Sequence, residues 1–336
     1  MTLEEKRQHD KEISDKYLLR DEDITEEEYA SLSIQDMCVL LNNAKWFLNS
    51  EDYVSDSDKS DDMKNRIRKM HSVLIQKIID APVIYSVLDT ATGYPFITEI
   101  EDSIWIFSTE EYANLCVEHY REEGRVFRVK EIKKEQFIPF LSRAFFTNGV
   151  GGIFVDNGQV GYFIKKEYIL KAPNYDNVPE KDIPVTNPGL MRAYMKFIQE
   201  KQWKVSYHER RKVLSKLEND LMRELPKARL LIPTKGAPES LDAKDIRLGR
   251  NANTILPMYE DNLGQKALPA FTDWNQFNLV YAGDEYHAWA MDFPAVAKIL
   301  YEENGFDCIV VNLKSRPLTI TRDVLSRLVE VVGNLW

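Results

Sequence analysis

Two acidic side chains flank a histidine in the last quarter of the chain, at Glu285, His287 and Asp292. General acid–base catalysis uses such groups, because imidazole gains and loses a proton near neutral pH. Alternation along an extended strand would place Glu285 and His287 on the same face. These three residues are therefore the candidate catalytic residues, although a chain with 29% charged residues also produces such clusters without a function.

A second pattern resembles the start of a calcium-binding loop. Asp56, Asp58 and Ser60 have the spacing of its first ligands, but Asp61 stands where the loop needs glycine and Ile67 where it needs glutamate. The five histidines of the chain are scattered, with no two at metal-ligand spacing. The sequence therefore predicts no metal site.

Glycines and hydroxyl side chains give two further patterns. The run Gly149-x-Gly151-Gly152 follows a predicted helix and precedes a strand, whereas a dinucleotide-binding motif requires strand, glycines and then helix. Ser108 and Thr272 each precede a predicted helix, so their expected role is helix capping. As nucleophiles they would need a positioned base, and no histidine lies beside them in sequence. The sequence predicts no cofactor.

Aromatic residues concentrate around one predicted helix and the strand after it, at Trp274, Tyr281, Tyr286 and Trp289. Core packing is the default for such residues. An exposed subset would instead form a recognition patch, because aromatic side chains anchor many protein interfaces. These four are the candidate binding residues.

Charge is distributed unevenly along the chain. The net charge is −10, and the first 30 residues contribute −6 of it, with eleven acidic and five basic residues. The remainder is nearly balanced and lacks the basic field that gives proteins affinity for phosphate backbones. A nucleic-acid partner is therefore not expected.

Cysteines and apolar runs indicate the compartment. Cys38, Cys116 and Cys308 are far apart and odd in number, which is typical of a reducing environment. The start of the chain lacks the basic end and apolar run of a signal peptide. Apolar runs such as 308–311 are far shorter than the roughly 20 residues of a membrane helix. We therefore expect a cytoplasmic protein without a membrane segment.

The elements that must position these residues form a series that occurs twice. Two predicted helices carry matching apolar stripes, at Ile67, Met70, Leu74 and Ile78 and, 147 positions later, at Leu214, Leu217, Leu221 and Leu225. Matching strands follow each stripe in the same order, with length changes confined to loops. This is the pattern of a duplicated supersecondary unit. Five matched or apolar positions are predicted to be buried: Phe107, Phe271, Leu221, Ile153 and Ile309.

The predicted fold class is α+β, with two duplicated units that each contain a mixed sheet and flanking helices. The predicted parts are an acidic leader (1–32), a first unit (33–170), a linker (171–186) and a second unit (187–336). Residues 1–24 have too few apolar residues to pack, 51–62 are expected to be a loop, and the second unit has a longer loop at 235–253. Capping boxes are predicted at Thr25, Ser108 and Ser206, each with glutamate three residues later.

Segments of the second unit resemble a known family. The segments are Leu256–Tyr259, a turn at Asp261–Gly264, Ala267–Thr272, Glu302–Gly305 and Ile309–Asn312. Together they resemble the signature of the SseB N-terminal-domain family, bacterial proteins named for enhancing serine sensitivity. The resemblance covers roughly 207–330 and, as a diverged second copy, 60–170. It implies neither a catalytic residue nor a cofactor.

The positions that match between the two predicted copies are core, helix-capping and turn positions. A duplicated enzyme domain would usually retain a cluster of polar catalytic residues in at least one copy. We therefore favour a non-enzymatic binding or adaptor protein that recognises a protein or peptide, with self-association as one form of this. The alternative is a hydrolase or small-ligand enzyme with its site in the cleft between the units.

Overall fold

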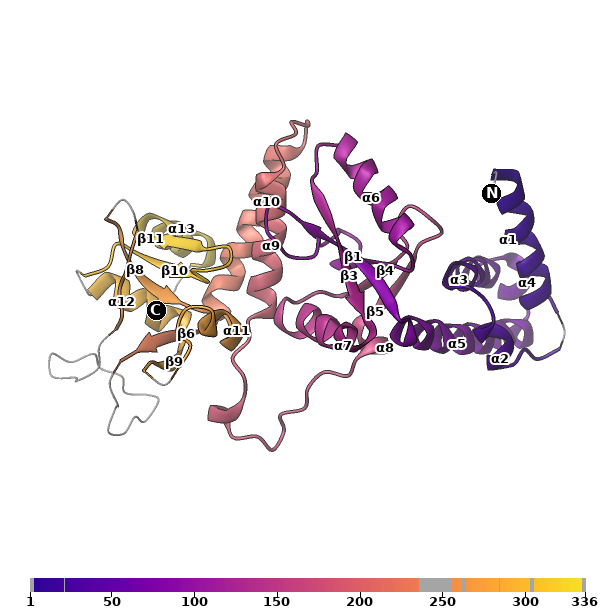
Figure 1. The fold of residues 1–336 in the computed structure, drawn as a ribbon, viewed down its shortest axis with the longest axis horizontal. Helices are drawn as coiled ribbons and strands as arrows, with labels where there is room; N and C mark the ends of the chain where they lie inside the picture. Colours follow the sequence, from indigo (N-terminus) through magenta and orange to yellow (C-terminus); the bar gives the residue numbers. More distant parts are fainter. Residues whose placement is uncertain are drawn as a thin grey trace. The chain divides into compact units, whose positions relative to one another are not determined.

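The computed structural model describes residues 3–20, 22–235, 256–261, 264–283, 285–302 and 305–333. They form two compact units (Figure 1). Unit 1 consists of Met1–Phe145, Val150–Ala172 and Gln202–Val205, and unit 2 of Phe146–Gly149, Pro173–Lys201 and Ser206–Trp336. The predicted long loop lies outside the described residues except for Lys235. Within the described ranges, no helix combines the length and the apolarity needed to cross a bilayer.

Unit 1 begins with three helices, α1 (Leu3–Tyr17), α2 (Glu26–Ala30) and α3 (Ile34–Leu48). The expectation that residues 1–24 have too few apolar residues to pack is wrong, because Ile13, Tyr17 and Leu18 are buried. Polar contacts also join α1 to α3, where a ring nitrogen of His9 lies 2.8 Å from a carboxylate oxygen of Asp36. The capping box predicted at Thr25 is confirmed at the start of α2.

The segment 51–62 is helical rather than a loop. It contains α4 (Glu51–Val54) and the first turns of α5 (Ser57–Asp80). The Asp56 carboxylate accepts hydrogen bonds from the backbone N–H groups of Asp58 and Lys59, both 3.1 Å long. This residue is therefore the N-cap of α5, which explains the acidic pattern without calcium.

The sheet of unit 1 is mixed. Its strands are β1 (Val83–Asp89), β2 (Ser103–Phe107), β3 (Phe127–Lys133), β4 (Gly152–Val155) and β5 (Tyr162–Lys165), in the order β3-β1-β2-β4-β5. The pair β2 and β4 is parallel, and the other pairs are antiparallel. The flanking helices are α6 (Glu110–Glu122), α7 (Lys134–Ser142) and the short α8 (Lys166–Ile169). Helix α6 packs on β1, β2 and β3, and α7 packs on β1, β3 and α5 (Figure 1).

Unit 2 begins with α9 (Pro188–Gln202) and α10 (Arg210–Glu224). The strands that follow are β6 (Arg229–Thr234), β7 (Tyr259–Glu260), β8 (Lys266–Ala270), β9 (His287–Asp292), β10 (Cys308–Val311) and β11 (Leu318–Thr321). The helices between and after them are α11 (Trp274–Asn278), α12 (Phe293–Glu302) and α13 (Arg322–Val332). Helix α10 begins at Arg210 with no side-chain cap, so the capping box predicted at Ser206 is wrong.

In unit 2 one sheet has the order β11-β10-β8-β7, and a second sheet pairs β6 with β9. An isolated antiparallel bridge between Leu231 and Phe271 connects β6 to the end of β8. The pair β8 and β10 is parallel, and the other pairs are antiparallel. When β7 is left aside and the bridge is counted, the series β9-β6-β8-β10-β11 has the same order and directions as the sheet of unit 1. Both units are therefore mixed α/β structures with mixed sheets, as predicted.

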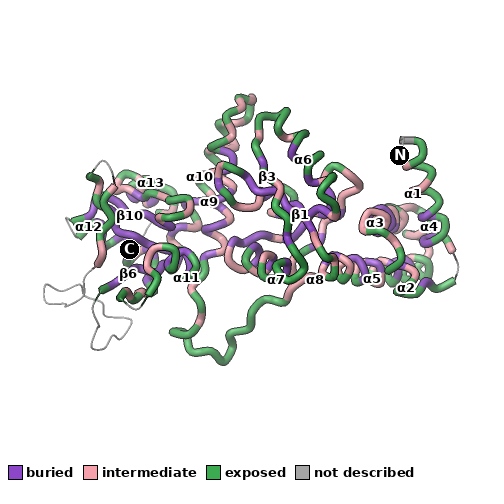
Figure 2. Tube along the Cα trace, viewed as in Figure 1, coloured by how far each residue is buried: buried purple, intermediate pink, exposed green. Residues whose placement is uncertain are grey.

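The core lies between the sheets and their helices (Figure 2). The residues predicted to be buried are confirmed, because each is at most 3% exposed: Phe107, Phe271, Leu221, Ile153 and Ile309. The predicted stripe on α10 is also largely buried, with Leu217, Leu221 and Leu225 inside. Apolar periodicity therefore identified the buried faces of the helices.

Candidate functional site

In each unit, a polar residue just after one strand of the parallel pair holds the end of the other strand of that pair. Asp156 follows β4 with φ 51°, and its carboxylate accepts from Ser108 N at 2.7 Å and from Ser108 Oγ at 2.8 Å. Asn312 follows β10 with φ 60°, and its Oδ1 accepts from Thr272 N at 3.0 Å. Its Nδ2 donates to Thr272 Oγ1 at 3.0 Å.

These contacts correct the capping role predicted for Ser108 and Thr272. The N-cap of α6 is Thr109, and the N-cap of α11 is Asp273, the next residue in each case. Among the described residues, neither predicted hydroxyl contacts a histidine that could act as a base. The Ser108 hydroxyl donates to Asp156, and the Thr272 hydroxyl accepts from Asn312.

Asp156 is a fully buried carboxylate. Burial raises the pKa of its carboxyl group, while hydrogen bonds from Ser108 and Gln35 oppose the rise. A carboxyl group with a raised pKa in the folded state stabilises the fold most at low pH, and this stability is lost as the pH rises through the folded pKa. Asn312 occupies the corresponding place in unit 2 without a charge.

We therefore expect Asp156→Asn to gain stability over the wild type as the pH rises from about 4.5 to 7, because the neutral amide removes the cost of burying a charge. Urea unfolding at both pH values measures the difference. Glu118→Gln, an exposed change on α6, is the control and should show no such trend. The prediction would be contradicted if the wild type became more stable relative to Asp156→Asn as the pH rose.

The three candidate catalytic residues do not converge. His287 and Asp292 are the first and last residues of β9, about 16 Å apart at the rise of a strand, and alternation places them on opposite faces. Glu285 forms an ion pair with Lys235. No group of side chains that could hold a metal ion occurs in the described part of the chain. The fold therefore gives this trio no shared reaction centre.

Three of the four candidate binding residues lie together on one face of unit 2. The ring centroid of Tyr281 lies 5.8 Å from that of Phe271 and 4.7 Å from that of Tyr286. Trp274 is 44% exposed, and its ring lies edge-on to Phe277, 5.4 Å away. We call this aromatic cluster, in which Phe271 and Phe277 are buried, the aromatic face: Phe271, Trp274, Phe277, Tyr281 and Tyr286.

Trp289 belongs elsewhere. It alternates with Ala288 and Ala290 along β9, so its side chain lies on the other side of the sheet. There it packs against the large core of unit 2, whereas Ala288 packs with the aromatic face. Trp289 is therefore separated from the other three candidates.

The helix that packs on the sheet differs in length between the two units, on the side of the sheet where the aromatic face lies in unit 2. In unit 1 the helix after β2 is α6, with 13 residues, and it contributes Ala113, Cys116 and Val117 to the buried cluster on the sheet. In unit 2 the helix after β8 is α11, with 5 residues. Leu279, just after α11, is 58% exposed, and Ala290 on β9 is also exposed.

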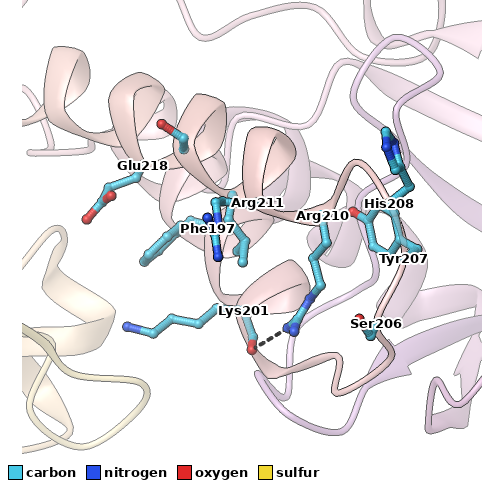
Figure 3. A pocket seen from close by; sticks show the side chains of 10 residues that line it. Phe197, Lys201, Ser206, Tyr207, His208, Arg210, Arg211 and Glu218 are labelled. Carbon is cyan, nitrogen blue, oxygen red and sulfur yellow. Dashed lines mark hydrogen bonds between the residues drawn. The ribbon is translucent and has the colours of Figure 1, made fainter.

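A polar groove of about 820 Å³ lies between α9 and α10 (Figure 3). Arg210 donates to the carbonyl oxygens of Glu200 and Lys201 at the end of α9, at 3.3 and 3.2 Å. The Tyr207 hydroxyl donates to the Glu200 carboxylate at 2.8 Å. These contacts fix the loop between the two helices and so shape the groove, which Lys201 and Arg211 also line.

Sequence reasoning missed this groove, because its walls come from two helices whose packing the sequence does not reveal. The signal was present as a local excess of positive charge. Between positions 201 and 216 there are six basic residues and one acidic residue: Lys201, Lys204, Arg210, Arg211, Lys212 and Lys216 against Glu209. The segment therefore has a net charge of +5 in a chain whose net charge is −10.

The SseB protein N-terminal domain family matches residues 211–327. The matched segment begins in α10 and ends in α13, so it includes the aromatic face. Searches of curated proteins and of solved structures gave no match.

Proposed function

We propose that the protein is a non-enzymatic binding or adaptor protein whose aromatic face captures an amphipathic helix of a partner protein. The observation that carries this proposal is the difference in cover between the two units. The same sheet face lies under a 13-residue helix in unit 1, whereas α11 in unit 2 has 5 residues. A helix supplied by a partner would complete the missing part of that layer.

Unit 1 indicates what such a helix would offer. On α6 the residues that pack against the sheet cluster are Tyr112 and a regularly spaced set, Ala113, Cys116, Val117 and Tyr120. The spacing of the last four is the i, i+3, i+4, i+7 pattern by which amphipathic helices bind grooves. The partner helix should therefore carry small and apolar residues at this spacing. Tyr281 and Tyr286, both partly buried, would contact it.

We also propose that unit 1 is a diverged second SseB-like unit, and that the division into 1–32, 33–170, 171–186 and 187–336 reflects this duplication. The equal strand order and directions support it. So do the matched contacts of Asp156 and Asn312 at the strand ends.

A cytoplasmic location remains our proposal. It rests on the three cysteines, all of which are buried as free thiols.

The binding proposal is tested with helical peptides selected on the full-length chain from a displayed library. Their affinities are then measured for the wild type and for Trp274→Ala. We expect at least a tenfold loss of affinity, since an exposed tryptophan at the edge of an aromatic cluster is a typical interface anchor. The unfolding midpoint should change little, because the side chain is 44% exposed.

Trp46→Ala is the matched control, because Trp46 on α3 of unit 1 is 68% exposed. It should leave the affinity unchanged. Equal losses in both variants, or selected peptides that stay extended when bound, would overturn the proposal. Turnover in a broad hydrolase screen that disappears in His287→Ala would favour the enzyme alternative instead.

A further inference from the structure

The α9–α10 groove carries positive charge that its own acidic residues do not neutralise. Glu218, on the groove wall, lies 3.3 Å from Arg327, and Glu209 lies 3.4 Å from Lys212. Arg211 and Lys216 form no ion pair with any described residue. Since the acidic groups already have partners, these two cations remain available to a ligand.

The positive surface is elongated. A second hollow of about 620 Å³ adjoins the groove and shares His208, Arg211 and Ser215 with it. From there it continues along α10 past Lys216 to Arg223. The distance from Arg211 to Arg223 is about 18 Å along the helix axis, which matches an extended peptide of about five residues.

We propose that this groove binds an acidic segment of a partner protein, a stretch of clustered aspartate and glutamate residues. The Arg211 guanidinium fits a carboxylate with two parallel hydrogen bonds. The hydroxyl groups of Ser206 and Ser215, also in the lining, supply hydrogen bonds to the backbone of a peptide. This site goes beyond the proposed function, because it uses different elements and a different chemistry from the aromatic face.

Charge favours a short acidic peptide over a nucleic acid. The affinity of a protein for duplex nucleic acid rests on neutralising a series of phosphates with lysine and arginine side chains. The basic segment here is short, and the chain as a whole has a net charge of −10. Long polyanions would therefore be repelled outside the groove.

The test uses the full-length chain and a fluorescent twelve-residue peptide built from four Glu-Glu-Ser repeats. Fluorescence anisotropy gives its affinity at about 50 mM and 300 mM salt, and the binding should weaken as salt screens the charges. The double variant Arg211→Glu/Lys216→Glu should weaken binding at 50 mM salt at least tenfold. Both side chains are exposed, so the fold should be retained.

The control Lys314→Glu/Arg316→Glu makes the same change in net charge at two exposed positions of unit 2 outside the groove. It should alter the affinity less than threefold. No peptide binding by the wild type, or equal losses in both double variants, would overturn the proposal. Tighter binding of a single-stranded oligonucleotide than of the peptide, lost in the groove variant, would assign the groove to nucleic acid instead. If millimolar inorganic phosphate displaced the peptide completely, the groove would be a simple anion-binding site and not a peptide-binding site.

Discussion

Phe271→Ala is expected to destabilise unit 2 by about 3–5 kcal/mol. Phe271 has no exposed surface, and its ring packs against Phe277 and Tyr281. Its backbone N–H and carbonyl both pair with Leu231, at 2.9 and 2.8 Å, which joins β8 to β6. Because the backbone is held in this way, the neighbours cannot collapse into the space that the ring leaves.

Denaturant unfolding of the full-length chain measures this effect. Trp274→Ala, whose ring lies at the exposed edge of the same aromatic face, is the control and should cost less than about 1 kcal/mol. A cost below about 0.5 kcal/mol for Phe271→Ala would show that the ring does not hold the core of unit 2. Phe271→Ala should also abolish peptide capture, since it removes the floor of the aromatic face.

The buried faces of the helices could be predicted from sequence because their signal is local. Apolar residues at helical spacing identified Met70, Leu74 and Ile78 on α5, and all three are buried. The same reasoning failed for residues 1–24, where acidic side chains dominate the composition. There the few apolar residues, such as Ile13 and Leu18, are buried together by packing that composition does not reveal.

Helix starts were predicted one residue too early where two capping residues are adjacent. Ser108 and Thr109 can both cap a helix, and local sequence does not distinguish them. The choice depends on Asp156, which lies 48 residues later and takes the Ser108 hydroxyl. Such a tertiary contact is not visible in a short sequence window.

The sequence predicted only in part which aromatic residues lie together in the fold. The aromatic concentration identified Trp274, Tyr281 and Tyr286, but it included Trp289, which strand alternation alone would have placed on the other face from Ala288. The α9–α10 groove could not be predicted as a cavity, because its walls come from two helices whose packing the sequence does not state. The local excess of positive charge between positions 201 and 216 can nevertheless be counted in the sequence.

Gly152→Ala is expected to destabilise unit 1 by about 3 kcal/mol. Gly152 is the first residue of β4, which lies between β2 and β5 in the sheet. An added Cβ would lie against the carbonyl oxygen of Ile164, far inside van der Waals contact, and 2.7 Å from a ring carbon of Phe163. Because Ile164 is paired with Ile153 in the sheet, its carbonyl cannot move without disturbing that pairing. Close packing of the strands thus explains a glycine that resembled part of a nucleotide-binding motif.

Gly158→Ala separates this clash from backbone strain. Gly158 has φ 90°, which alanine adopts only with strain, but no atom lies within 4 Å of its added Cβ. We expect a cost of about 1–2 kcal/mol there, clearly less than at Gly152. Urea unfolding of the two variants at one pH gives the comparison. If Gly152→Ala costs no more than Gly158→Ala, then β4 and β5 can separate enough to admit a methyl group, and close strand packing is not the reason for glycine at this position.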